Sequence, residues 1–204
     1  MRERLEQVSG RPVPRETIEK LETFVALLTD ENRRQNLVSA STLGSMWERH
    51  ILDSAQLVRL ASRAESSWVD IGSGAGLPGI VISCMVGGPV TLVEPRRLRA
   101  DFLHKVVEVL ELDANVVCDR AERLEGKFHT ITARAVAPLA RTFELSHHLS
   151  TGNSTWILPK GRNAQSELAE ARRAWQGVFH VEQSLTDPDS RIVVARHVKA
   201  RRKL

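Results

Sequence analysis

The stretch Trp68-Val-Asp-Ile-Gly-Ser-Gly-Ala-Gly-Leu-Pro-Gly79 decides the fold, because a short apolar strand runs directly into a glycine-rich turn and the start of a helix. Gly72, Gly74 and Gly76 carry no Cβ, so backbone N–H groups on the inner wall of the turn can approach a ligand closely. This pattern predicts a nucleoside cofactor bound on the turn.

Asp70, within this strand, bears on which cofactor binds. A carboxylate there repels a pyrophosphate and attracts an ammonium or a sulfonium, and S-adenosylmethionine carries both of these cations. The spacing Gly74-x-Gly76-x-x-Gly79 also satisfies the dinucleotide fingerprint, which keeps an NAD-dependent oxidoreductase open. Glu94, which ends the next predicted strand, suits either cofactor, since a carboxylate can accept hydrogen bonds from both ribose hydroxyls.

Predicted strands and helices alternate after this stretch, whereas the residues before it are helical. Apolar residues recur at helical spacing within 17–28 and 46–60, which predicts a small N-terminal helical extension over residues 1–64. Strands are expected at 68–72, 90–94, 114–118, 129–135, 154–159, 178–184 and 191–197, with helices at 78–87, 97–111, 138–148 and 163–176. This order predicts an α/β Rossmann-like domain over residues 65–204, with a mostly parallel sheet. The last two strands lie too close together for a crossover helix, so we expect an antiparallel pair at the end of the sheet.

Length and composition narrow the class of protein. With 204 residues and 42% hydrophobic content, the chain suffices for one main domain and a small appendage. No apolar run approaches the roughly 20 residues that span a bilayer, and the first ten residues lack the apolar region of a secretory signal. Cys84 and Cys118 form no CxxC pair and no zinc pattern, so we expect reduced packing residues and no metal. These features predict a cytoplasmic protein, and nothing in them requires more than a monomer.

The charge distribution points to an acidic partner. The formal net charge is +4, and Arg supplies 23 of the 29 basic residues, which suits phosphate recognition. A basic C-terminal tail contains Arg196, Lys199, Arg201 and Arg202, and we expect these four residues to bind RNA. The alternative is that the basic clusters are ordinary solvated surface.

Five short motifs run in order through residues 15–197. They are Asn32-x-x-x-Asn36-Leu37, Arg49-His50-Ile-Leu-Asp53-Ser54, Asp70-Ile-Gly-Ser-Gly-Ala-Gly-Leu-Pro-Gly-Ile80, Thr132-Ala-Arg134-Ala135 and Pro159-Lys160-Gly161. Together they resemble the RsmG (GidB) family. The resemblance implies a class I S-adenosylmethionine-dependent methyltransferase with a seven-stranded sheet, which methylates N7 of one guanine in the 530 hairpin loop of bacterial 16S rRNA. It also implies S-adenosylhomocysteine as product, and loss-of-function alleles with low-level streptomycin resistance.

The same resemblance implies a set of site residues. The cofactor contacts would be Gly72, Leu77, Ala121, Glu122 and Arg134, with Glu94 on the ribose and Gly74 and Gly76 shaping the turn. Ala121 can contribute only its backbone, which fits an adenine held by main-chain groups beside the Glu122 carboxylate. Arg134 is expected closest to both the methyl donor and the target base. Its alternative role is an ion pair with Asp70 or Glu94.

The chemistry of the target base agrees with what the chain lacks. Guanine N7 has an in-plane lone pair and no proton, so its methylation requires no general base. The chain has no Asn/Asp-Pro-Pro-aromatic motif for an adenine amine, and neither cysteine has the context of a C5 nucleophile. Lys160, the second candidate catalytic residue beside Arg134, keeps a ribose 2′-O-methyltransferase open. Another methyltransferase of the same fold, such as one that acts on a small molecule, is also an alternative. A non-catalytic ribosome-assembly factor is a further alternative.

His50 and Asp53 lie three residues apart in a predicted helix. On one helical face they would either brace the N-terminal extension against the cofactor turn or simply pack there.

Overall fold

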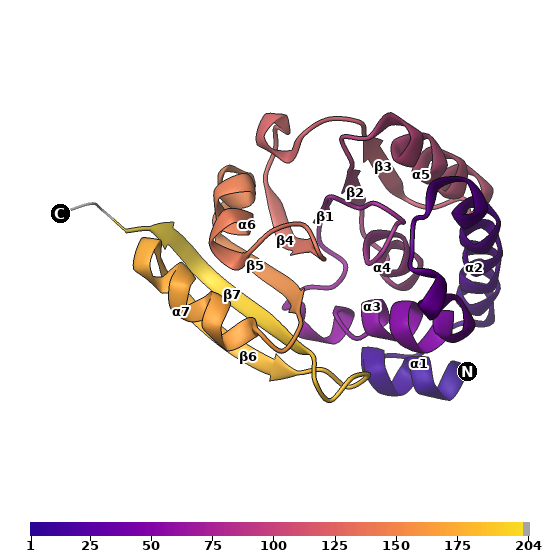
Figure 1. Cartoon of the computed structure of the whole chain (residues 1–204), viewed down its shortest axis with the longest axis horizontal. Helices are drawn as coiled ribbons and strands as arrows, with labels where there is room; N and C mark the ends of the chain where they lie inside the picture. Colours follow the sequence, from indigo (N-terminus) through magenta and orange to yellow (C-terminus); the bar gives the residue numbers. More distant parts are fainter. Residues whose placement is uncertain (202–204) are drawn as a thin grey trace.

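The computed structural model describes residues 1–201, in which a seven-stranded sheet carries helices on both faces (Figure 1). The strands are β1 (Trp68–Ile71), β2 (Val90–Val93), β3 (Ala114–Val117), β4 (Phe128–Ala133), β5 (Ser150–Lys160), β6 (Trp175–Gln183) and β7 (Arg191–Ala200). Their order in the sheet is β3-β2-β1-β4-β5-β7-β6. Strands β1 to β5 pair in parallel, and β7 runs antiparallel to both β5 and β6. The predicted mostly parallel sheet with an antiparallel end pair is confirmed.

The helices divide between the two faces of the sheet. They are α1 (Arg2–Ser9), α2 (Arg15–Gln35), α3 (Asp53–Ala55), α4 (Gly79–Met85), α5 (Arg97–Val109), α6 (Leu139–Ser146) and α7 (Ala164–Ala174). Single 3₁₀ turns occur at η1 (Ala40–Ser45), η3 (Val58–Leu60), η4 (Ala121–Arg123) and η5 (His147–Leu149), and η2 (Trp47–Leu52) is π-helical. Helices α2, α4 and α5 share one apolar cluster, whereas α6 and α7 share the other (Figure 1).

Strand β1 lies between β2 and β4 in the centre of the sheet, and all four of its residues are buried. Trp68 packs in the cluster on the α4 face, while Val69 and Ile71 pack in the cluster on the α6 face. Side chains alternate along a strand, so Asp70 points to the α4 face. The apolar run is therefore a strand that is covered on both faces, as expected for the centre of a parallel sheet.

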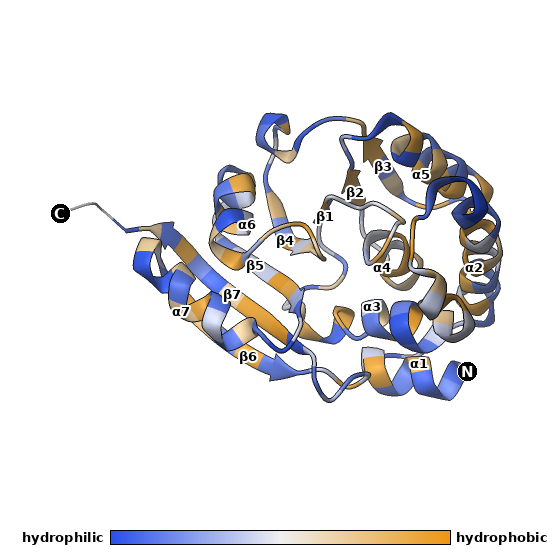
Figure 2. Cartoon of the chain, viewed as in Figure 1, coloured by the Kyte–Doolittle hydropathy of each residue, from blue (hydrophilic) through white to orange (hydrophobic). Residues whose placement is uncertain are grey.

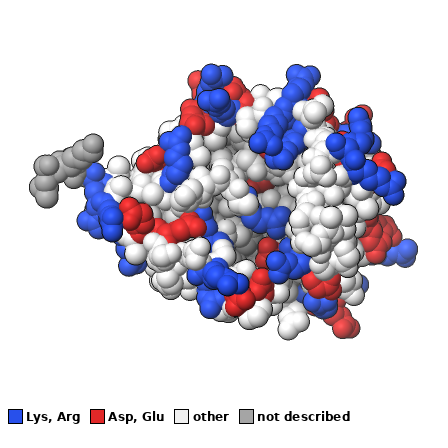
Figure 3. Space-filling model, in the orientation of Figure 1, with Lys and Arg blue, Asp and Glu red and all other residues white. Residues whose placement is uncertain are grey.

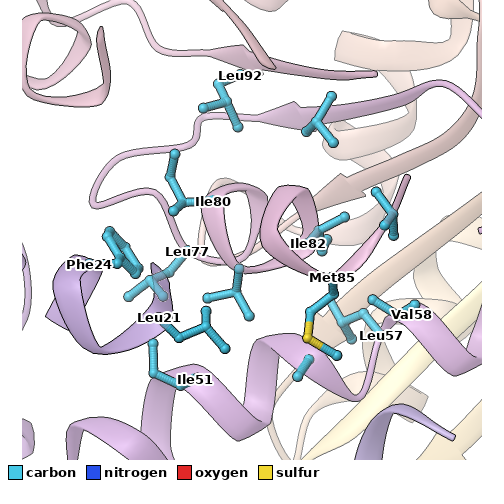
Figure 4. Packing of buried hydrophobic residues seen from close by; sticks show 14 of the residues in the cluster. Leu21, Phe24, Ile51, Leu57, Val58, Leu77, Ile80, Ile82, Met85 and Leu92 are labelled. Atoms are coloured by element: carbon cyan, nitrogen blue, oxygen red, sulfur yellow. The ribbon is translucent and has the colours of Figure 1, made fainter. Parts of the chain in front are cut away.

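The N-terminal helices share their core with the sheet. Leu21 and Phe24 of α2 are fully buried and pack in one cluster with Leu77 and Ile80, which come from the glycine turn and α4 (Figure 4). Burying one such side chain contributes roughly 1.5–3 kcal/mol. Figure 2 shows the same division, with apolar residues on the inner faces of the helices and polar residues outside. The extension thus packs directly against the glycine turn and α4. Its boundary near residue 64 stays a prediction.

Three expected elements differ from the structure. The predicted helix over 46–60 is a succession of π-helical, α-helical and 3₁₀ turns, because apolar spacing does not distinguish these hydrogen-bond patterns. Strand β6 begins at Trp175, where a helix over 163–176 was expected. Strand β7 continues beyond the expected end at residue 197, since it pairs with β5 from Arg191 to Arg196 and with β6 as far as Ala200.

The chain adds its successive strands on one side of β1 as far as β3 and on the other side from β4 onward. From β1 it proceeds to β2 and β3, whereas β4 leads to β5 on the opposite side. Residues Ile71 and Ala133 are partners across this boundary, so Gly72 and Arg134 follow directly at the carboxyl ends of the two strands. Ligands of open α/β sheets bind at such a switch point. Within residues 1–201, no helix has both the length and the apolar character needed to cross a bilayer.

Candidate cofactor and substrate site

Two cavities at the carboxyl ends of the strands share Val136 in their walls. The smaller has a volume of about 230 Å³, and the apolar side chains of Ile71, Val93 and Leu145 line it together with Gly72, Ala121 and Glu122. The larger has a volume of about 510 Å³, and its wall combines apolar residues with the charged or polar side chains of Asp53, Arg134, Lys160, Glu167, Ser184, Ser190 and Arg191. The apolar cavity suits a flat base, and the polar one suits a charged or hydrogen-bonding ligand.

Gly72 forms part of the wall of the smaller cavity, and its backbone needs glycine. Its φ is +66°, and a Cβ at this position would lie 2.7 Å from Cγ2 of Val136. Gly76 has φ +85°, and its Cβ would lie 2.6 Å from Cγ1 of Ile80 in α4. The first glycine lets the turn lie against Val136 in the cavity wall, whereas the second lets the turn close against its own helix.

Glu94 holds the glycine turn from the neighbouring strand. Its Oε2 accepts a hydrogen bond from the backbone N–H of Gly74 at 2.9 Å, its Oε1 accepts from that of Arg96 at 2.8 Å, and the residue is 3% exposed. Each oxygen keeps a second lone pair. The assignment of Glu94 to the cofactor ribose therefore stays a prediction, and its observed contacts shape the turn.

Two other residues predicted to bind the cofactor, Leu77 and Asp70, have side chains buried in the core beside the turn. The Leu77 side chain is buried among Leu21, Phe24 and Ile51 (Figure 4). Only its backbone is therefore left to contact a cofactor. Asp70 is fully buried, and its Oδ2 accepts a hydrogen bond of 3.0 Å from the backbone N–H of Gly79 at the start of α4. Its Oδ1 accepts no hydrogen bond from any residue within 1–201. The direct attraction of Asp70 for a sulfonium stays a prediction, while its observed contact fixes where α4 begins.

Burial raises the pKa of Asp70 from 3.8 to about 7. Between these values the unfolded carboxyl ionises while the folded one keeps its proton, so this group makes the free energy of unfolding decrease as the pH rises from 3.8 to 7. We expect the Tm of the wild type to fall relative to that of Asp70→Asn across this window, measured by calorimetry from pH 4 to 8. Asp30→Asn, on the exposed surface of α2, is the matched control. Parallel curves for wild type and Asp70→Asn would contradict a buried, protonated acid.

Ala121 and Glu122 lie in η4, directly after β3, and both line the smaller cavity with Gly72. Ala121 is 7% exposed, and Glu122 is exposed and lies 3.5 Å from Arg141 of α6. The structure therefore brings together three of the residues predicted to bind the cofactor. An apolar slot with a carboxylate at its rim fits a purine and its amino group.

Arg134 lines the larger cavity, and its guanidinium is largely buried. The NH1 group lies 3.3 Å from Oδ2 of Asp53, in the N-terminal extension. Asp53, and neither Asp70 nor Glu94, is thus the ion-pair partner of Arg134. The next residue, Ala135, has φ +57°, a left-handed conformation that costs an ordinary residue roughly 1–2 kcal/mol. Strain of this kind is typical of functional segments.

Lys160 is held tightly beside the same segment. Its Nζ donates to the carbonyl oxygen of Ala137 at 2.7 Å and lies 2.9 Å from Oε2 of Glu167, which also accepts from the backbone N–H of Leu139 at 2.9 Å. The ammonium therefore ties the segment 134–139 to β5 and α7. These contacts position the segment, and a catalytic role for Lys160 stays a prediction.

The predicted RNA-binding residues lie away from the two cavities. Arg191 pairs with Lys160 at the carboxyl end of β5, whereas Arg196 pairs with Thr155, further toward the amino ends of the parallel strands. Lys199 and Arg201 continue in that direction, and Arg202 lies outside the described residues. The basic C-terminal stretch and the cavities are thus at opposite ends of β7.

Comparison with known proteins decides between the cofactor classes. The family model for GidB, described as rRNA small subunit methyltransferase G, matches residues 17–193. The chain belongs to the GidB family. It is 46% identical over 195 residues to "Ribosomal RNA small subunit methyltransferase G" of Zymomonas mobilis, covering 91% of this chain and 88% of the relative. The protein of the same name from Sphingopyxis alaskensis is 50% identical over 178 residues, covering 86% and 76%.

A solved structure of similar fold carries a related description. The TehB-like SAM-dependent methyltransferase from Corynebacterium glutamicum aligns with a TM-score of 0.59 at 14% identity, over 84% of this chain and 98% of that one. At this identity the likeness shows the fold of this GidB-family member and nothing more.

The structure of this GidB-family chain also reveals residues that the sequence did not single out. Val136 lines both cavities, and Glu167, Ser184 and Arg191 line the larger one. Glu167 belongs to an ordinary amphipathic helix, and Ser184 and Arg191 flank a hairpin, so no local pattern distinguishes them. Among residues 1–201, no group of three or more His, Cys, Asp or Glu is arranged to hold a metal ion.

Proposed function

We propose that this GidB-family chain transfers the methyl group of S-adenosylmethionine to N7 of a guanine in the 530 hairpin loop of 16S rRNA. The observation that carries the proposal is the pair of cavities that adjoin at Val136, because a methyl donor and its acceptor must bind in adjacent sites where the two reacting atoms can come into direct contact. Its partner would be 16S rRNA or the small subunit, met in the cytoplasm by a monomer.

The smaller cavity fits the adenosine of the cofactor. Gly72 lets the turn lie against Val136 in the cavity wall, Ala121 offers backbone groups, and Glu122 offers an acceptor for the adenine amine. S-adenosylmethionine, when bound, supplies an electrophilic methyl carbon on a sulfonium. The apolar side chains of Ile71, Val93 and Leu145 would exclude water from the base.

The larger cavity fits a guanine that presents its N7. The two acidic side chains in its described wall are ion-paired, Asp53 with Arg134 and Glu167 with Lys160, so neither is free to act as a base. Methylation of N7 requires none, since N7 carries no proton. The guanidinium of Arg134 can donate hydrogen bonds to O6 of a guanine, which leaves the lone pair of N7 free to attack the methyl group, or to phosphate. We infer that Arg134 orients the base and that Lys160 holds the segment around it.

A strain that lacks the gene tests the proposal. Reduction followed by aniline cleaves 16S rRNA at N7-methylguanosine, so we expect a strand break in the hairpin loop of the wild type and none in the deletion strain. Re-expression of the gene is the control and should restore the break. An unchanged break in the deletion strain would contradict the proposal. Loss of a 2′-O-methyl group instead would favour the ribose-modifying alternative.

Arg191 provides a prediction about RNA binding. It lines the larger cavity, and its NH1 donates to the carbonyl oxygens of Pro188 and Ser190 at 2.7 and 2.9 Å, which holds the charge at the cavity mouth. Figure 3 shows Lys and Arg side chains around a central hollow on this view of the molecule. We expect Arg191→Ala to weaken rRNA binding and to lower the slope of log K against log salt by about 1. The measurement is fluorescence anisotropy at several salt concentrations.

The matched control is Arg15→Ala, since Arg15 is 89% exposed on α2 and pairs only with Glu19 in the described chain. Arg196→Ala tests the competing prediction made from the sequence. If Arg196→Ala lowers the salt slope and Arg191→Ala does not, the RNA follows the far end of β7 and the proposed cavity-mouth contact is wrong.

A further inference from the structure

The N-terminal extension contacts Arg134 through two side chains. Oδ2 of Asp53 lies 3.3 Å from NH1 of Arg134, and Nδ1 of His50 lies 3.5 Å from NH2 of the same guanidinium. His50 belongs to the π-helical turn η2, and Asp53 follows it at the start of α3. Such wide turns are rare and frequently occur at functional sites.

The hydrogen bonds around His50 determine which ring nitrogen faces Arg134 as an acceptor. The hydroxyl of Thr42 donates to the carbonyl oxygen of Ser39 at 2.9 Å, and Nε2 of His50 lies 2.9 Å from the same hydroxyl oxygen. Since the Thr42 hydroxyl donates to Ser39, we infer that Nε2 of His50 carries the hydrogen and donates it to the Thr42 oxygen. Nδ1 then has a free lone pair directed at an N–H of Arg134.

The charge state of His50 agrees with this tautomer. Burial and the nearby cation Arg134 lower the pKa of His50 from 6.5 to about 4, and Arg49 adds to this shift. The carboxylate of Asp53 acts in the opposite direction. The ring is therefore neutral near pH 7 and accepts a hydrogen bond from Arg134 without repelling it.

Asp53 is itself fixed from its other side. Its Oδ1 accepts hydrogen bonds from Nε2 of Gln56 and from the hydroxyl of Thr186, both at 2.9 Å. Gln56 is 2% exposed, and its Oε1 accepts from the backbone N–H of Leu185 at 2.8 Å, so the hairpin between β6 and β7 docks on the extension at this point. These contacts leave Oδ2 of Asp53 for Arg134 alone among the described residues.

We propose that His50 and Asp53 are positioning residues that hold the Arg134 guanidinium in the orientation used for methyl transfer, with Thr42 fixing the tautomer of His50. The N-terminal extension is thereby part of the active site. The inference rests on the proposed function, because it assumes that Arg134 meets the reacting groups.

A pair of nearly isosteric substitutions tests the role of His50. Asn carries an acceptor oxygen at the δ position, where His50 carries Nδ1, whereas Leu has a similar shape and no acceptor. The measurement is the single-turnover rate of guanine methylation with saturating S-adenosylmethionine and small subunits. We expect His50→Leu to lose about 10- to 100-fold in rate, because small misplacements of a catalytic group are costly, and His50→Asn to stay close to the wild type. Equal rates for the two variants would overturn the proposal.

A second pair keeps the test valid if His50→Leu fails to fold. Thr42→Val removes the acceptor for the His50 Nε2–H, whereas Thr42→Ser keeps it. We expect a lower single-turnover rate for Thr42→Val, with normal rates for Thr42→Ser. Wild-type rates in both variants would also overturn the proposal. If the wild-type enzyme methylates no guanine, the proposed function is wrong. If all variants methylate guanine at the wild-type rate, the function stands and only the positioning role is wrong.

The pH dependence of stability provides a readout beyond activity. The unfolded ring takes up a proton near pH 6.5 and the folded one only near pH 4, so His50 makes the free energy of unfolding decrease as the pH falls through this window. Asp70 acts with the opposite sign over an overlapping range, and Arg134, Asp53 and Arg49 are the charged groups that act on His50. The comparison is therefore between wild type and His50→Asn. We expect the wild-type Tm to fall more steeply from pH 6.5 to 4, and parallel curves would contradict the neutral, acceptor form of His50.

Discussion

Replacing Arg134 with Ala is expected to lower the rate of methyl transfer by about 100- to 1,000-fold, the usual effect of removing a preorganised donor from an active site. The guanidinium is largely buried in the wall of the larger cavity and is held by Asp53 and His50. The two other cations that line the cavity among the described residues are held elsewhere, since Lys160 contacts Glu167 and Ala137 and Arg191 donates to the carbonyl oxygens of Pro188 and Ser190. The measurement is single-turnover methylation of small subunits from a strain that lacks the gene.

Arg134→Lys separates charge from geometry. A lysine keeps the positive charge but cannot present two N–H groups in a fixed plane, so we expect it to remain severely impaired. Arg173→Ala is the control, since Arg173 is 79% exposed and pairs with Glu170 on α7. Full activity in Arg134→Ala, in a variant whose Tm shows that it is folded, would remove Arg134 from the site.

Gly72→Ala is expected to abolish measurable cofactor binding. The new Cβ would lie 2.7 Å from Cγ2 of Val136, inside the wall of the smaller cavity, and a φ of +66° costs an alanine roughly 1–2 kcal/mol. For the wild type, S-adenosylmethionine at about 100 times its Kd adds roughly 2.7 kcal/mol to the free energy of unfolding. In a chain of this length that raises Tm by about 5–10 °C. The variant should show no such increase.

Gly87→Ala is the matched control for this substitution. A Cβ at Gly87 meets nothing within 4 Å and its backbone needs no left-handed φ, so the shift in Tm on adding cofactor should be that of the wild type. If Gly72→Ala binds S-adenosylmethionine with wild-type affinity, the smaller cavity does not hold the cofactor.

The cofactor turn was predictable from sequence because its causes are local. Strand β1, three glycines with positive φ and the start of α4 lie within a dozen consecutive residues, and each glycine is needed by its own backbone or its immediate neighbours. The antiparallel strand pair was predictable for a similar reason, since too few residues separate β6 from β7 for a crossover.

The surroundings of Arg134 were not predictable in the same way. Its partner Asp53 lies 81 residues earlier in the chain, and the contact exists only because the N-terminal extension packs beside the switch point of the sheet. The sequence therefore suggested Asp70 or Glu94, which are nearer in the sheet but turn toward backbone N–H groups at Gly79 and Gly74. Composition also suggested that the basic residues from Arg196 onward form an RNA-binding tail. Pairing of β7 with both neighbours makes most of that stretch a strand.

The most direct test of the central claim is the chemical identity of the product. Purified protein is incubated with methyl-labelled S-adenosylmethionine and small subunits from the deletion strain, and the rRNA is digested to nucleosides for mass spectrometry. We predict that the label appears in N7-methylguanosine from the hairpin loop, and that Arg134→Ala lacks it. Label in a 2′-O-methyl nucleoside, or in no nucleoside at all, would contradict the account.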